Sequence, residues 1–142
     1  MPSLDNMMLR QIIMDHYENP RNRELVEDDS YKKVNMDSET CIDNIDIQAK
    51  IENGVIEDIR FDGEACAICT SSTSIMTELL IGKTIDEANV IIENYNNMIY
   101  EKDYDPEILE EAIAFMNTHK QANRIKCATL GWTGIKQILD KE

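Results

Sequence analysis

The most constraining feature of the sequence is a strict alternation of apolar and polar residues between positions 44 and 51. The apolar set is Ile45, Ile47, Ala49 and Ile51, and the polar set is Asn44, Asp46, Gln48 and Lys50. Successive side chains of a strand point to opposite faces, so this pattern predicts a strand with one buried face. Residues 55–62 predict a partner strand, and Asn53-Gly54 between the two marks a hairpin.

The apolar faces of the two strands also predict how they pair. A two-residue loop at Asn53-Gly54 would set apolar side chains opposite charged ones, for example Ile47 opposite Arg60. A three-residue loop that begins at Glu52 would keep one face apolar. Its pairs would be Ile51 with Val55, Ile47 with Ile59 and Ile45 with Phe61. Because burial of one face sets the register, the sequence favours the three-residue loop.

Helical patterns occupy most of the remaining chain. A first helix is predicted from a cap at Ser3 to Asn19-Pro20, since the residue before proline resists the helical conformation. One face of it carries Leu9, Ile12, Ile13 and Tyr17. A short edge strand is predicted over residues 31–36. Helices are expected at about 66–81, from a capping box at 84–87 to about 95, from 105 onward and at 121–139, with Gly131 and Gly134 bending or breaking the last.

Composition narrows the class of protein. The chain has 142 residues, 42% of them hydrophobic, which suits one domain spanning residues 1–142. Its 28 acidic and 14 basic residues give a net charge of -14, which disfavours nucleic acid as a partner and favours basic protein surfaces. No apolar run approaches the ~20 residues that span a bilayer, so no membrane is expected. Without a secretion signal at its start, the protein is predicted to be cytoplasmic.

The predicted hairpin gathers candidate metal ligands. Extending the pairing brings residue 43 opposite residue 63 and residue 41 near residue 65, and paired residues lie ~5 Å apart. Cys41, Asp43 and Cys66 therefore converge at the end of the hairpin away from its turn. Two thiols and a carboxylate suit a zinc-like or iron-like ion, although small buried cysteines are the alternative.

The remaining cysteines are harder to place. Cys127 lies beside Lys126 and shortly after Arg124, and these cations favour its thiolate form. Spacing alone does not connect Cys127 to the hairpin. Cys66 and Cys69 form a C-x-x-C pair, which is compatible with half a zinc site, a redox dithiol or a coincidence, and we favour packing or an auxiliary role for Cys69. The histidines, His16 and His119, have no metal-ligand pattern around them.

Four sequence blocks resemble the IscU/SufU/NifU N-terminal family of iron–sulfur cluster assembly proteins. The blocks are residues 15–22 (DHYENPRN), 41–43 (CID), 63–68 (GEACAI) and 124–130 (RIKCATL). Their order and spacing match the family over nearly the whole chain. The resemblance implies an α+β fold in which helices cover a three-stranded antiparallel sheet and the C-terminal half is helical.

The same resemblance implies one site for Cys41, Asp43, Cys66 and Cys127. In the family this site holds zinc, or receives iron and sulfur to build a [2Fe–2S] cluster, with sulfur supplied as persulfide by a cysteine desulfurase. The chain looks closest to the SufU branch, because Lys126 stands where IscU-type proteins carry histidine. The resemblance then implies that Cys41 accepts persulfide from a SufS-like desulfurase. Ile42, in place of the usual family glycine, and Cys69 depart from the family pattern.

The expected function is therefore that of a zinc-bound sulfur acceptor for iron–sulfur cluster assembly, which passes sulfur on to downstream assembly or client proteins. Such a protein is an acceptor or scaffold rather than a typical turnover enzyme. Two alternatives remain open at this point. The same four ligands could assemble a [2Fe–2S] cluster, or they could form a structural zinc module that mediates protein contacts. A redox role for Cys66 and Cys69 is a further one.

Overall fold

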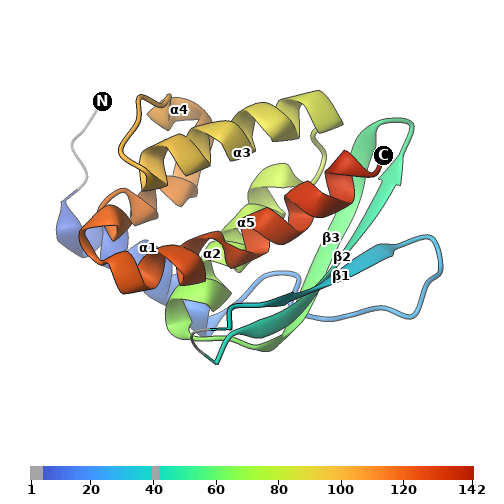
Figure 1. Ribbon diagram of the computed structural model, residues 1–142, viewed down its shortest axis with the longest axis horizontal. Coiled ribbons are helices and arrows are strands. Elements are labelled where there is room, and N and C mark those ends of the chain that lie inside the picture. The colour runs from blue at the N-terminus through green and yellow to red at the C-terminus, as the bar shows by residue number, and fades with distance from the viewer. Residues whose placement is uncertain (1–4, 40–41) are drawn as a thin grey trace.

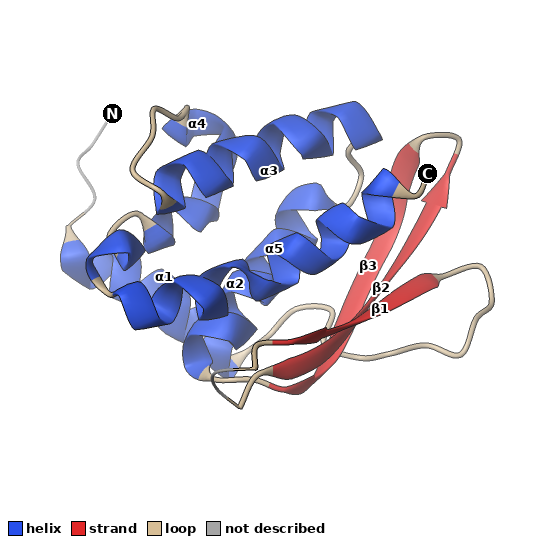
Figure 2. Cartoon of the chain, viewed as in Figure 1, coloured by secondary structure: helices blue, strands red, loops and turns tan. Residues whose placement is uncertain are grey.

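The computed structural model describes residues 5–39 and 42–142, and it shows a three-stranded antiparallel sheet with helices against its apolar face (Figures 1 and 2). The elements are α1 (Asn6–Glu18), β1 (Lys32–Asp37), β2 (Asn44–Glu52), β3 (Val55–Glu64), α2 (Ala67–Leu80), α3 (Ile85–Ile99), α4 (Pro106–Leu109), the 3-10 turns η1 (Glu110–Phe115), η2 (Thr118–Lys120) and η3 (Ala122–Arg124), and α5 (Ile125–Asp140). The sheet order is β1-β2-β3. The predicted α+β class and its helical C-terminal half are confirmed.

The hairpin register differs from the prediction. Glu52 pairs with Val55 across a two-residue turn, in which Asn53 and Gly54 have φ of 54° and 75°. A bulge next to Ile51 then shifts the pairing. Beyond it the apolar face is continuous, with pairs Ala49–Ile59, Ile47–Phe61 and Ile45–Gly63. The three-residue loop was wrong because only regular ladders were compared, whereas one extra residue in β3 restores the apolar face behind a tight turn.

The first helix differs from the prediction in its N-cap residue and in which side chains face the core. The Asp5 carboxylate caps α1 by accepting a backbone hydrogen bond of 2.8 Å, while Ser3 lies outside the described residues. The helix ends before Asn19-Pro20, as predicted. Tyr17 is 43% exposed, so its expected place on the inner face is wrong, and His16 is fully buried instead. A one-residue change turns a helical side chain by about 100°, which is enough to exchange the two positions.

Helix α2 is the centre of the molecule and contacts α1, α5 and β3 (Figure 1). It carries a fully buried polar run, residues 70–74. Hydroxyl groups in this run donate to carbonyls of their own helix, as Ser71 does to the Ala67 carbonyl at 2.7 Å. Ser74 Oγ instead meets His16 and the backbone of Arg21, and Thr73 Oγ1 has no hydrogen-bond partner among the described residues. These small side chains let three elements approach α2 closely.

Helix α5 is continuous, so the predicted bend or break at Gly131 and Gly134 is wrong. A Cβ on Gly131 would lie 2.4 Å from Thr73 Oγ1, and one on Gly134 would lie 2.5 Å from Ile47 Cδ1. Both glycines are therefore needed for close contact with α2 and with the sheet. The cost of glycine within a helix is offset by this packing.

The remaining elements agree in kind with the sequence and differ in length. The capping box of Thr84 and Glu87 is present, and α3 extends to Ile99. The helix expected from Asp105 is only one turn long and continues as 3-10 turns. No described helix is both long and apolar enough to cross a membrane.

Candidate metal centre

Asp43 lies immediately before β2, and its side chain is fully buried. The backbone N–H of Ser38 donates to the Asp43 carbonyl at 3.0 Å, which closes the connection between β1 and β2. The Asp43 carboxylate accepts the backbone N–H of Cys66 through Oδ1 at 2.7 Å. A buried carboxylate needs such hydrogen bonds or a cation to offset its lost hydration. Asp43 thus joins the start of β2 to the start of α2.

Cys66 is the N-cap residue of α2. Its Sγ accepts the backbone N–H of Cys69 at 3.4 Å and donates to Asp43 Oδ2 at 3.6 Å. The N-cap position therefore places a side chain suited to a metal beside the buried carboxylate.

Gly63, at the end of β3, allows this close approach. It has φ of 136°, and a Cβ there would lie 2.3 Å from the Asn44 carbonyl oxygen. Arg23 holds the same segment by donating to the Gly63 carbonyl at 2.8 Å. Any larger residue would push β3 away from β2 at the point where Asp43 meets Cys66.

Cys127 completes a three-residue group from a distant part of the chain. It lies in the first turn of α5 and is 2% exposed. Suitable ligand atoms of Asp43, Cys66 and Cys127 all lie within 4.8 Å of one another. Of the four ligands expected from the sequence, the structure brings these three together, and Cys41 lies outside the described residues. Ile42, next to Cys41, is 67% exposed.

The donor set and its spacing fit a zinc-like ion. With Zn–S near 2.3 Å and Zn–O near 2.0 Å, tetrahedral sulfur and oxygen ligands lie about 3.5 Å apart. The separation of Cys66 Sγ and Asp43 Oδ2 is 3.6 Å. Two sulfurs with one carboxylate oxygen also suit iron. Asp43, Cys66 and Cys127 are thus the described residues that would hold a metal at this site.

Cys69 does not belong to this group. Its side chain is fully buried in the apolar core, one helical turn after Cys66. Burial raises the pKa of Tyr95, with a smaller contribution from the nearby Cys69 side chain, so Cys69 lies towards the Tyr95 side of α2. This location supports the interpretation of Cys69 as a packed side chain.

A second group of potential ligands consists of His16, Glu78 and Glu111, which the sequence gave no reason to connect. His16 Nδ1 shares a hydrogen bond of 2.8 Å with Ser74 Oγ, and His16 Nε2 lies 3.3 Å from Glu111 Oε1. Arg21 Nε lies 3.4 Å from Glu78 Oε1. The three residues come from α1, α2 and η1, so no local spacing could have shown that they meet.

The sequence block at residues 15–22 has a structural role here. Arg21 pairs with Asp15 at 2.8 Å, and its backbone N–H donates to Ser74 Oγ at 2.9 Å. Asn22 donates to Thr77 Oγ1 at 3.0 Å, and its carbonyl accepts the Phe61 N–H. The block therefore fastens the end of α1 to α2 and β3.

Comparison with known proteins places this fold in a family. The family model described as the NifU-like N terminal domain matches residues 8–141. The chain is 38% identical to the zinc-dependent sulfurtransferase SufU of Bacillus subtilis, covering 95% of this chain and 91% of that protein. It is 31% identical to the iron–sulfur cluster assembly scaffold protein IscU of Streptococcus pyogenes, covering 96% of this chain and 85% of that protein.

A solved structure gives the same result for the fold. A putative iron–sulfur cluster assembly scaffold protein for the SUF system from Fervidobacterium islandicum superimposes with a TM-score of 0.83, at 28% identity, over 91% of this chain and 94% of the other. The chain belongs to the NifU-like N-terminal domain family. The predicted resemblance to iron–sulfur cluster assembly proteins, nearest the SufU branch, is confirmed.

Proposed function

We propose that this protein is a zinc-bound sulfur acceptor in iron–sulfur cluster assembly, working as one domain over residues 1–142 in the cytoplasm. The observation that carries the proposal is the group of Asp43, Cys66 and Cys127, whose ligand atoms lie within 4.8 Å of one another. Similarity to a zinc-dependent sulfurtransferase supports zinc over other ions. Cys41 is the proposed fourth ligand, from the family resemblance.

Each described ligand has a role that follows from its position. Cys66 and Cys127 are held at the starts of α2 and α5, so they anchor the site. Asp43 is the harder donor, and it exchanges more readily from a zinc ion than a thiolate does. Its hydrogen bond from the Cys66 N–H keeps the carboxylate oriented during such an exchange. Zinc, when bound, keeps the thiols deprotonated near neutral pH.

The proposed transfer step is a thiol–disulfide type exchange. The Cys41 thiolate attacks the outer sulfur of a cysteine persulfide carried by a SufS-like desulfurase. A bond forms between Cys41 Sγ and that sulfur, the S–S bond of the donor breaks, and the donor cysteine leaves as its thiolate. The step needs no external oxidant, because one S–S bond breaks as another forms and the persulfide moves from the donor to Cys41. The sulfur then passes to downstream assembly or client proteins.

A second candidate is a scaffold that assembles a [2Fe–2S] cluster on the same ligands. Similarity to IscU scaffold proteins favours it. The position before Cys127 is Lys126 rather than histidine, which distinguishes the chain from IscU-type sequences. The two functions differ in what the ligands hold at rest, zinc in one case and iron with sulfide in the other.

Metal analysis paired with a sulfur-transfer assay tests the proposal. The protein as purified should contain one zinc per chain. After incubation with its desulfurase and cysteine, alkylation followed by mass spectrometry should find the persulfide on Cys41. Cys41→Ser should remove acceptance, whereas the control Cys69→Ala should retain both zinc and acceptance, because Cys69 lies outside the ligand group.

Three results would overturn the proposal. If Cys41→Ser accepted sulfur as well as the native chain, Cys41 would not be the acceptor. If anaerobic addition of iron and sulfide displaced zinc and gave a stable visible absorption band, the scaffold function would replace it. If none of the cysteines reacted with persulfide and removal of the metal unfolded the chain, the site would be a structural zinc module.

A further inference from the structure

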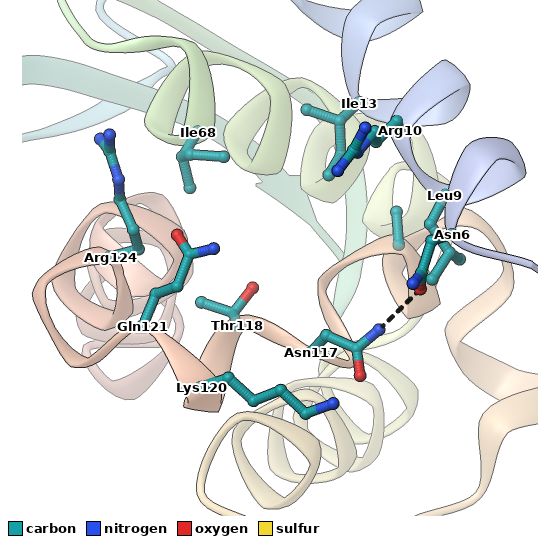
Figure 3. Close-up of a pocket in the computed structure, with 11 residues that line it drawn as sticks. Asn6, Leu9, Arg10, Ile13, Ile68, Asn117, Thr118, Lys120, Gln121 and Arg124 are labelled. Atoms are coloured by element: carbon teal, nitrogen blue, oxygen red, sulfur yellow. Dashed lines mark hydrogen bonds between the residues drawn. The ribbon is translucent and has the colours of Figure 1, made fainter.

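A hollow of about 290 Å³ opens between α1, the start of α2 and the turns η2 and η3 (Figure 3). Its floor is apolar and consists of Leu9, Ile13, Ile68 and Ala114. Three cationic side chains stand around it, one from each of three elements: Arg10 from α1, Lys120 from η2 and Arg124 from η3. Among the described residues, no Asp or Glu lines the hollow.

The chain has 28 acidic and 14 basic residues, and half of the basic side chains form ion pairs among the described residues. Arg21, Arg23 and Arg60 all form ion pairs, for example. Within residues 5–39 and 42–142, no ion pair involves Arg10, Lys120 or Arg124. Three positive charges thus face one hollow with no internal partner.

The polar groups beside these cations can also bind an anion. The Asn117 side-chain amide donates to Asn6 Oδ1 at a long 3.4 Å, and both residues line the hollow beside Thr118 and Gln121 (Figure 3). Amide and guanidinium N–H groups are the donors that carboxylates prefer, and arginine can hold a carboxylate through two hydrogen bonds. Leu9 and Ala114 are buried beneath, so the base of the hollow offers apolar contact to a carbon skeleton.

We propose that this hollow binds a small organic polyanion with two or more carboxylate groups. Charges on three separate elements around one hollow suit a compact ligand with separated charges, whereas an extended acidic peptide would need a row of cations. The apolar floor favours a ligand with a carbon skeleton over inorganic phosphate. The site goes beyond the proposed sulfur transfer and does not depend on it.

The hollow lies beside the helix starts that carry metal ligands. Ile68 lies in the first turn of α2, whose N-cap is Cys66, and Arg124 immediately precedes α5, which carries Cys127. A ligand in the hollow would therefore join α1 to the two helix starts that hold metal ligands. Its binding is measurable without any metal chemistry.

The test uses the full zinc-loaded chain and the probe tricarballylate, a tricarboxylate without the hydroxyl that makes citrate a stronger chelator. Calorimetry should show binding, and NMR should show shifts at the Arg10 and Arg124 Nε–H groups. The variant with Arg10→Gln and Lys120→Gln should bind about tenfold more weakly, because it removes two of the three charge contacts. The matched control, with Lys102→Gln and Lys141→Gln, removes two exposed cations outside the hollow and should bind normally.

Four outcomes would overturn the proposal. Absence of binding at about 10 mM tricarballylate would do so, since that limit is weaker than most specific sites. Equal weakening in the control variant would show a diffuse charge effect. Phosphate binding as tightly as tricarballylate would indicate a simple oxyanion site, and tighter binding of a hexaglutamate peptide would indicate a surface for acidic protein segments.

Discussion

This protein has two groups of three potential metal ligands, and they differ in ligand type and in burial. Asp43, Cys66 and Cys127 combine sulfur with one carboxylate and lie in the interior or partly within it. In the other group, buried His16 meets two exposed carboxylates, Glu78 and Glu111. Both groups satisfy the same test of proximity, and only their chemistry and their partners distinguish them.

The difference lies in what the side chains already bind. His16 is engaged on both ring nitrogens, by Ser74 and by Glu111, and Glu78 is paired with Arg21. A cation entering there would have to displace Arg21, so this group acts as a fastening between α1, α2 and η1. In the sulfur group, by contrast, the Cys66 thiol donates a hydrogen bond to the Asp43 carboxylate. A metal ion could take the place of the thiol proton. Proximity of ligand types therefore identifies a metal site only where a metal ion can take the place of a proton and need not displace a paired cation.

The largest expected effect is on zinc affinity, which should depend on the sulfur-containing group and not on the group around His16. Cys66→Ser should lower zinc affinity at least about 100-fold, because an alcohol is a poor ligand at neutral pH and changes to supporting residues alone cost 10–100-fold. Competition with a chromophoric chelator measures it. Glu111→Gln should bind zinc as the native chain does. Loss of zinc in Glu111→Gln would break the comparison and show that the second group holds metal.

The next effect concerns stability without any change in metal. His16→Ala should lower the free energy of unfolding by about 2–3 kcal/mol, because it empties a fully buried position and removes one hydrogen-bond partner of Ser74. Urea unfolding of the zinc-loaded chain measures this. Tyr17→Ala, at the exposed neighbouring position, should change it by no more than about 0.5 kcal/mol. Equal losses in the two variants would contradict the role of His16 as a buried fastening.

A smaller effect tests the packing that carries Cys127 to the site. Gly131→Ala should destabilise the chain by about 1–2 kcal/mol, because the clash with Thr73 outweighs the better helix propensity of alanine. Adding Thr73→Ala should restore most of that loss, since it removes the nearest atoms and a hydroxyl without a partner. Thr133→Ala, on the exposed face of α5, should have little effect. A Gly131→Ala variant as stable as the native chain would argue against close contact of α2 and α5.

The smallest effect is expected at the exposed carboxylate of the second group. Glu111→Gln should change the free energy of unfolding by less than about 1 kcal/mol, since Glu111 is half exposed and its amide replacement can still accept a hydrogen bond. Thermal unfolding at low and high salt measures it, and the difference should shrink with salt. A loss as large as that of His16→Ala would mean that the pair is far less screened than its exposure indicates.

Local sequence patterns predicted the helices and strands, and they predicted that Asp43 and Cys66 lie close together. The alternation at residues 44–51 predicted β2, and the chain reversal that follows it brings Asp43 to Cys66 whichever register the hairpin takes. The observed register differs by two residues from the predicted one, and an even shift keeps the same side chains on the buried face. The predicted convergence of Asp43 and Cys66 therefore survived an error in the turn.

The sequence by itself determined the strands, most helix boundaries and the residue types of a sulfur-rich site, because these depend on periodicity, caps and turns within a few residues. Only the tertiary structure decided that α5 remains unbroken, that His16 is buried in place of Tyr17, and that Cys127 reaches Asp43 and Cys66. The physical reason is distance along the chain. Cys127 is placed by the contact of Gly131 with Thr73, and such packing between helices leaves no mark in the local sequence of either one.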